Sequence, residues 1–172
     1  MASDRQAPGH DPGDAAVVQA QLGRPPRGRF EVAHRCGCGL PDVIATPPRL
    51  PDGSPFPTAF YLTCPRAASL IGRLEASGLM TAMTERLAVD ETLASRYAAA
   101  HEDFLRRRDA LGELATRESA GGMPTRVKCL HALVAHSLVA GPEVNPFGDE
   151  ALAQLPQWGA AGPCVVPAEA AP

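Results

Sequence analysis

The chain has 172 residues, with 45% hydrophobic and 5% aromatic residues, 16 basic residues and 19 acidic residues. This length is typical of one domain, and the hydrophobic content is sufficient for a packed core dominated by aliphatic side chains. The formal net charge of −3 argues against nucleic-acid binding, which usually depends on a strong basic excess.

The sequence shows no pattern typical of export or membrane insertion. It contains no run of about 18 apolar residues, the minimum for a transmembrane helix. Its first residues, MASDRQAPGHDPGD, lack a basic segment followed by an apolar one. We therefore expect a cytoplasmic protein without a membrane span. Because cytoplasmic thiols are mostly reduced, clustered cysteines are expected to serve metal or redox roles rather than structural disulfides.

In chain order, the first half predicts a small sheet. A short helix is predicted at 17–22, and the Gly- and Pro-rich segment that follows it is a loop. Asp52-Gly53 is a turn signal. The predicted strands, which together indicate an antiparallel sheet of about three strands, are 30–34, 42–46 and 56–63.

From residue 65 onwards, apolar residues recur at helical spacing. Pro65 and Pro124 suit first helical positions, Asp90 is a good N-cap, and Gly78 is a plausible stop. The predicted helices are 65–78, 79–88, 91–114, 125–140 and a short one at 148–155. The fold class is therefore α+β, with a small antiparallel sheet packed against four or five helices. The domain is expected at 17–155, between disordered tails at 1–16 and 156–172.

Four cysteines lie in three separate segments of the predicted domain, and they predict a metal site. Cys36 and Cys38 form a Cys-x-Cys turn, Cys64 lies where a strand meets a helix, and Cys129 is on the predicted helix 125–140. Zinc is held tetrahedrally by four Cys or His ligands, and iron–sulfur clusters use Cys thiolates. We therefore predict a zinc or iron–sulfur site with Cys36, Cys64 and Cys129 as ligands.

The fourth ligand is left open among Cys38, His131 and His136. On a regular helix, Cys129 and His131 are about 160° apart around the axis, so they can share one ion only if the helix is irregular there. Cys129 and His136 share a face but are about two turns apart. Cys164 lies in the predicted C-terminal tail and is given no role.

Two other hypotheses remain. In the first, the chain is a thiol-dependent enzyme in which the dipole of the following helix lowers the pKa of Cys64, the candidate nucleophile. Arg24, Arg27 and Arg35 would then bind an anionic substrate. In the second, the cysteines are buried packing residues and the chain is a non-catalytic interaction module. The sequence does not decide whether the chain is an enzyme or name its partner.

Seven segments of the sequence form an ordered run of motifs: Gly23-Arg24-Pro25, His34-Arg35-Cys36, Pro51-Asp52-Gly53-Ser54-Pro55-Phe56-Pro57-Thr58, Leu62-Thr63-Cys64-Pro65, Leu74-Glu75-Ala76-Ser77-Gly78, Gly121-Gly122-Met123-Pro124 and Lys128-Cys129-Leu130-His131. This run resembles the bacterial, actinobacterial-type domain-of-unknown-function family numbered 501. The resemblance covers roughly residues 17–152 and implies no established activity. It singles out Cys36, Cys64, Cys129 and His131, and it favours a three-cysteine site with one histidine.

Overall fold

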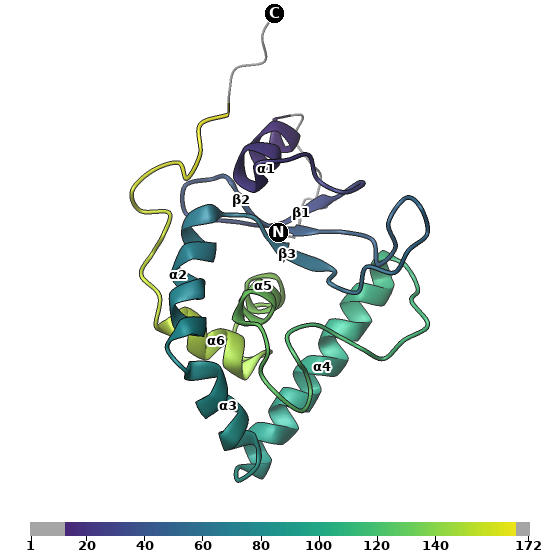
Figure 1. The fold of residues 1–172 in the computed structure, drawn as a ribbon, viewed down its shortest axis with the longest axis vertical. Coiled ribbons are helices and arrows are strands. Elements are labelled where there is room, and N and C mark those ends of the chain that lie inside the picture. Colours follow the sequence, from purple (N-terminus) through teal and green to yellow (C-terminus); the bar gives the residue numbers. More distant parts are fainter. Residues whose placement is uncertain (1–12, 168–172) are drawn as a thin grey trace, which may run out of the picture.

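The computed structural model describes residues 13–167 and confirms the α+β class (Figure 1). Three strands form an antiparallel sheet in the order β1-β2-β3. The strands are β1 (Glu31–Arg35), β2 (Pro41–Ala45) and β3 (Phe60–Leu62). The six helices are α1 (Asp14–Leu22), α2 (Pro65–Ala76), α3 (Leu79–Leu87), α4 (Glu91–Leu111), α5 (Leu130–Ala140) and α6 (Pro146–Ala153).

The sheet separates two hydrophobic clusters of unequal size. Helix α1 packs on one face, where Val18 meets Phe30, Val32 and Ile44. The other face contributes Val43 and its neighbours on β3 to the main core, and helices α2 to α6 lie on this side of the sheet (Figure 1). Every residue of β2 is buried because both faces of this central strand are covered.

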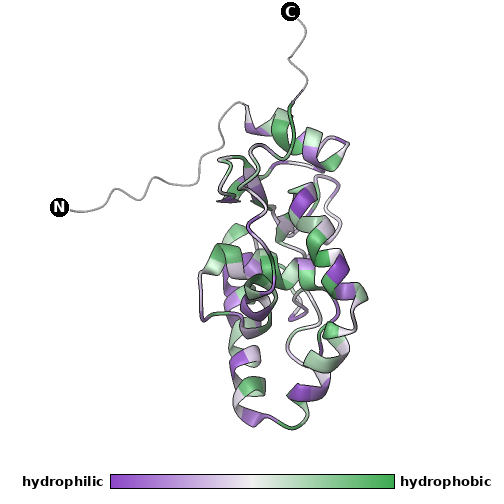
Figure 2. Cartoon of the chain, turned by 90° about the vertical axis from the view of Figure 1, so that its left-hand side faces the viewer, coloured by the Kyte–Doolittle hydropathy of each residue, from purple (hydrophilic) through white to green (hydrophobic). Residues whose placement is uncertain are grey.

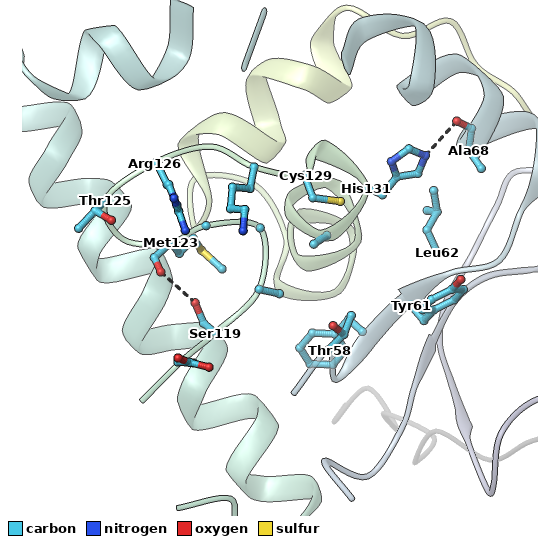
Figure 3. A pocket seen from close by; sticks show the side chains of 17 residues that line it. Thr58, Tyr61, Leu62, Ala68, Ser119, Met123, Thr125, Arg126, Cys129 and His131 are labelled. Carbon is cyan, nitrogen blue, oxygen red and sulfur yellow. Dashed lines mark hydrogen bonds between the residues drawn. The ribbon is translucent and has the colours of Figure 1, made fainter. Parts of the chain in front are cut away.

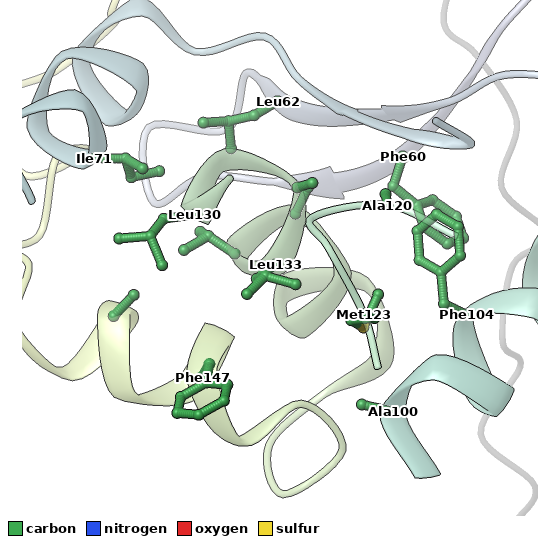
Figure 4. Packing of buried hydrophobic residues seen from close by; sticks show 14 of the residues in the cluster. Phe60, Leu62, Ile71, Ala100, Phe104, Ala120, Met123, Leu130, Leu133 and Phe147 are labelled. Atoms are coloured by element: carbon green, nitrogen blue, oxygen red, sulfur yellow. The ribbon is translucent and has the colours of Figure 1, made fainter. Parts of the chain in front are cut away.

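Helix α5 is the centre of the main core. Its Leu130 and Leu133 are fully buried between β3 and α6, where they meet Leu62 and Phe147 (Figure 4). From the other side, Phe104 of α4 packs against the core. The surrounding helices show mixed hydrophobic and hydrophilic residues along their lengths, as expected for helices that bury one face (Figure 2).

Several local predictions are confirmed by the backbone. Pro65 is the first residue of α2, and the Asp90 side chain caps α4 by accepting a hydrogen bond from the Leu93 amide at 2.9 Å. Gly78 separates α2 from α3 with φ +84°, a conformation that favours glycine. The described residues contain no helix that is long and apolar enough to span a membrane.

Two predicted elements were too long by five residues each. The third strand covers 60–62 rather than 56–63, because Pro57 lacks the amide hydrogen that a ladder needs and the Phe56 amide donates to the Pro48 carbonyl instead. The helix predicted at 125–140 begins only at Leu130. The described chain also continues past both ends of the predicted domain 17–155, since α1 starts at Asp14 and Trp158 packs against the main core. Residues 1–12 and 168–172 of the predicted tails lie outside the described residues.

Candidate metal site

Cys129 and His131 lie side by side because Cys129 is outside the helix. Cys129 is the N-cap of α5 and has an extended backbone, with φ −154° and ψ 108°. The predicted separation of about 160° assumed that both residues follow helical geometry, and it was wrong for this reason. The two side chains are hydrogen-bonded to each other.

Glu75, near the end of α2, binds the start of α5. Its Oε1 accepts hydrogen bonds from the Leu130 amide at 2.7 Å and from the His131 amide at 3.4 Å. The first amides of a helix have no partner within the helix, and they favour a negative charge nearby. The carboxylate therefore caps α5 from a residue 55 positions earlier in the chain.

His131 is held at both ring nitrogens. Nδ1 lies 3.0 Å from Oε1 of Glu75, and Nε2 lies 3.0 Å from the Ala68 carbonyl oxygen. The hydrogen bond with Cys129, together with the Glu75 carboxylate, raises the pKa of His131 to about 9 against the opposing effect of burial. The pKa of Glu75 is lowered: burial would raise it, but the His131 contact and the α5 amides outweigh burial. Both partners thus favour an ion pair in the metal-free protein.

These three side chains form a compact ligand group. One ligand atom each from Glu75, Cys129 and His131 lies within 4.8 Å of the other two, and no other such group occurs within residues 13–167. Cys129 and His131 also line a cavity of about 910 Å³ between β3, α5 and the segment before α5 (Figure 3). The group therefore opens onto a space large enough for a small molecule.

The cavity wall opposite β3 is a loop with two adjacent glycines. Gly121 and Gly122 have positive φ, and a Cβ on Gly122 would lie 2.7 Å from the Arg126 carbonyl oxygen. The Lys128 amide closes the loop on the Gly121 carbonyl at 2.7 Å. The amides of Arg126 and Lys128 donate to the carbonyls of Gly122 and Gly121 within this loop. Residues 125–129 therefore do not extend α5 towards its N-terminus.

Two cations line the same cavity. Arg126 and Lys128 are exposed on this loop, and neither side chain has an ion-pair or hydrogen-bond partner within the described part of the chain. Several other arginines are paired, for example Arg86 with Glu150 at 2.8 Å. Glu118 lines the same cavity and offsets one of these two charges, so the wall carries a net positive charge beside the ligand group.

The remaining predicted metal ligands lie elsewhere. Cys36 and Cys38 are in the turn between β1 and β2, and Cys64 is the N-cap of α2. Within residues 13–167, none of them belongs to a compact ligand group with Cys129. His136 is fully buried in the core, where its ring bonds to Asp103 at 2.9 Å and to the Asn145 side chain at 3.1 Å.

Cys64 does not have the properties of the predicted nucleophile. It is placed at a helix N-terminus as predicted, but its exposed fraction is 0%. Burial raises the pKa of Cys64 to about 11 and outweighs the amides of the helix that lower it. A reactive thiol needs both access and a lowered pKa.

The predicted anion-binding arginines are divided between two places. Arg35 forms two hydrogen bonds with the carboxylate of Asp14, at 2.7 and 3.0 Å. Arg24 and Arg27 line a separate cavity of about 240 Å³ beside α1. The cations nearest the candidate metal site are instead Arg126 and Lys128.

Glu75 was missed as a site residue. On an amphipathic helix, an isolated glutamate has the pattern of a solvated surface residue. Its one distinguishing signal is that it lies within Leu74-Glu75-Ala76-Ser77-Gly78, one of the segments that carry the family resemblance. Spacing alone could not relate it to Cys129 across the intervening chain.

The ion pair predicts a loss of stability at alkaline pH. The folded pKa of His131, about 9, lies above the unfolded value of about 6.5, so the contribution is complete below pH 6.5 and is lost as pH rises through 9. With allowance for a side chain that is 32% exposed, we expect a loss of about 1 kcal/mol. Urea unfolding of metal-free, reduced protein at pH 6, 7.5 and 9 measures this loss. If the free energy of unfolding changed with pH equally in wild type and His131→Gln, the prediction would be contradicted.

Comparison with known proteins gives one result. A family model described as a protein of unknown function (DUF501) matches residues 32–153, a range that includes Glu75, Cys129 and His131. No curated protein matches the chain, and no solved structure matches it. Because the match spans more than half of the sequence and runs from β1 to α6, the chain belongs to the DUF501 family.

Proposed function

We propose that this protein binds zinc through Glu75, Cys129 and His131, with one coordination position open to the adjoining cavity. The observation that carries the proposal is that their ligand atoms lie within 4.8 Å of one another, with Cys129 and His131 at the cavity wall. Zinc sites with three protein ligands and an open fourth position are typical of catalytic rather than structural sites.

The donor set supports zinc. A thiolate, an imidazole and a carboxylate are the three side-chain types that zinc accepts, and they come here from Cys129, His131 and Glu75. Iron–sulfur clusters are held mainly by several cysteines, whereas this group contains one. The donor set therefore favours zinc over a cluster at this position.

The surroundings of His131 also support metal binding. Its Nε2 lies 3.0 Å from the Ala68 carbonyl oxygen, which can only accept a hydrogen bond. Nε2 must therefore carry the proton, and in the neutral ring the lone pair of Nδ1 faces Glu75. Metal-bound histidines are usually oriented in this way, with the other ring nitrogen donating to a backbone carbonyl or carboxylate.

The same geometry disfavours a nucleophilic role for Cys129. In a Cys-His-carboxylate triad, the thiol and the carboxylate use different ring nitrogens of the histidine. Here Nε2 is occupied by Ala68, so Nδ1 would have to serve both Glu75 and Cys129. One metal ion can bind all three side chains at once, whereas one proton on Nδ1 cannot be shared by both Glu75 and Cys129.

We further propose that the occupant of the cavity is a small anion. Arg126 and Lys128 supply positive charge without a partner among residues 13–167, and Ser119 and Thr125 add hydroxyl groups to the wall. When bound, zinc would offer its open position to an oxygen of the anion and would lower the pKa of a coordinated water. Phosphate esters and carboxylates are the ligand classes that such a wall favours.

The proposal is tested by zinc titration of protein freed of metal by chelation and assayed in reductant. We expect His131→Gln to weaken zinc binding at this site by at least about 100-fold, since removal of even an outer-shell partner costs 10- to 100-fold. His101→Gln is the matched control, because His101 is a buried histidine of α4 that bonds to Ser119 and has no part in the ligand group. Equal zinc affinity in wild type and His131→Gln would overturn the proposal.

A further inference from the structure

A second group of cysteines lies around the edge of the sheet, separate from the Glu75–Cys129–His131 group. Cys36 and Cys38 lie in the turn between β1 and β2, and Cys64 caps α2. The fourth member is Cys164, in the segment that follows α6. We refer to these four residues as the thiol cluster.

The segment that carries Cys164 is fastened to the other members. Arg66, two residues after Cys64, donates to the carbonyls of Gly162 at 2.7 Å and Pro163 at 2.9 Å. Gly159 lies against the Cys-x-Cys turn so closely that a Cβ there would be 2.9 Å from the Cys38 amide nitrogen. The C-terminal segment thus crosses the sheet edge at the cysteines.

The four thiols form two contacting pairs. Cys36 and Cys38 are hydrogen-bonded to each other, as are Cys64 and Cys164. The Cys164 amide donates to the Cys38 sulfur and thereby joins the pairs. Within residues 13–167, no three of these sulfurs lie within 4.8 Å of one another, so the two pairs are neighbours but do not form one compact group of sulfurs.

Three of the four sulfurs in the cluster also accept a hydrogen bond from a nitrogen. The Cys38 amide donates to Cys36 and the Gln21 side chain donates to Cys164, both at 3.3 Å. The Cys38 sulfur accepts from the amides of Leu40 and Cys164. Donors of this kind surround metal-bound thiolates, because they stabilise negative charge on sulfur.

Unsatisfied polar atoms gather at the same place. Within the described residues, four buried side-chain nitrogen or oxygen atoms have no hydrogen-bond partner: Gln21 Oε1, Asp42 Oδ2, Thr63 Oγ1 and Trp158 Nε1. Gln21 donates to Cys164, Thr63 precedes Cys64, and the charge of Asp42 acts on Cys36. Buried polar groups are normally paired, so three of these atoms, on Gln21, Thr63 and Asp42, mark the surroundings of the thiols as incompletely satisfied.

We propose that Cys36, Cys38, Cys64 and Cys164 form a second, structural zinc site that holds the C-terminal segment on the sheet edge. On binding, each thiol releases its proton to solvent and each sulfur bonds the ion, so four sulfur ligands complete the tetrahedron. With zinc–sulfur bonds of about 2.3 Å, the sulfurs must come to about 3.8 Å from one another. The two pairs therefore close on each other as the ion binds.

A redox role fits the thiols less well. One thiol of each pair is buried, since Cys36 is 7% exposed and Cys64 is 0% exposed. Thiol–disulfide exchange requires that the attacking thiolate reach a disulfide sulfur, and burial prevents that access. Zinc can displace a thiol proton directly, and it does not need an oxidant.

The test is cobalt and zinc titration of reduced, metal-free full-length protein, comparing wild type, Cys164→Ser and Cys129→Ser. Cobalt replaces zinc and reports its thiolate ligands by charge-transfer absorption. We expect two ions per wild-type chain and one in each variant. Cys164→Ser should lose most of the charge-transfer intensity, whereas Cys129→Ser should retain most of it. Val165→Ala is the matched control in the same segment, and circular dichroism of each metal-free variant checks its fold.

The outcomes separate the two sites. One ion per wild-type chain that is lost in Cys129→Ser and kept in Cys164→Ser overturns the thiol-cluster site and leaves the cavity site standing. The reverse pattern supports the thiol-cluster site and removes the cavity site. Rapid loss of two thiols to glutathione disulfide, with a cobalt spectrum that Cys164→Ser does not change, would identify Cys64 and Cys164 as a redox pair and overturn the inference.

Discussion

Replacing Glu75 with alanine is expected to weaken zinc binding at the cavity by at least about 100-fold. The same change should lower the free energy of unfolding of the metal-free protein by about 2 kcal/mol at pH 7. The two effects have different causes. One is the loss of a ligand, and the other is the loss of the carboxylate that accepts the Leu130 and His131 amides and pairs with the His131 ring.

Glu75→Gln separates these causes. Glutamine retains an acceptor oxygen for the α5 amides but loses the charge that zinc and the imidazolium require. We therefore expect zinc binding to be lost as in Glu75→Ala, with a stability loss of less than about 1 kcal/mol. Isothermal titration with zinc and urea unfolding give the two readings. An alanine variant that binds zinc like wild type would show that the carboxylate is only a helix cap.

Arg108→Met is expected to destabilise the fold by about 3–5 kcal/mol, the largest stability effect of any change proposed here. The Arg108 side chain is 1% exposed and donates to three carbonyls of the segment after α4. The acceptors are Glu118 at 2.6 Å, Thr116 at 2.8 Å and Leu114 at 3.4 Å. Methionine fills the space but leaves these carbonyls without their buried donor, and each such loss costs about 1–3 kcal/mol.

The neighbouring Arg106 supplies the control. Its side chain is 70% exposed and pairs with Asp103 on the same helix, so Arg106→Met should cost less than about 1 kcal/mol. Urea unfolding of both variants at pH 7 measures the difference. Because Glu118 and Ser119 of the Arg108-bound segment line the cavity, Arg108→Met should also weaken anion binding there. Equal stability of the two variants would contradict the prediction.

The fold could be predicted where local chemistry decides the structure. Pro65 and Asp90 begin their helices as predicted, since a proline at the first position and an aspartate cap act within a few residues. The start of α5 could not be found in this way. Val127 donates its amide to the Thr84 hydroxyl at 2.9 Å, a partner 43 residues away, and no local pattern contains that contact.

The candidate site was predicted only in part, for a related reason. Cys129 and His131 were both proposed as ligands, but a helix assumed to include Cys129 separated them. Glu75 looked like a surface residue, and Cys164 was set aside because it lies among alanine, proline and glycine. Both gain their importance from contacts across more than 50 residues, which composition and periodicity do not report.

The position of Glu75 at the start of the most buried helix has a consequence for metal affinity. One ligand, Cys129, is the N-cap of α5, another, His131, is its second residue, and Glu75 accepts hydrogen bonds from its first amides. Fraying of the first turn of α5 would therefore move the three ligands apart. A substitution in the core, such as Leu133→Ala, should weaken zinc binding although Leu133 is not a ligand. Zinc affinity would therefore report changes in the packing of the core.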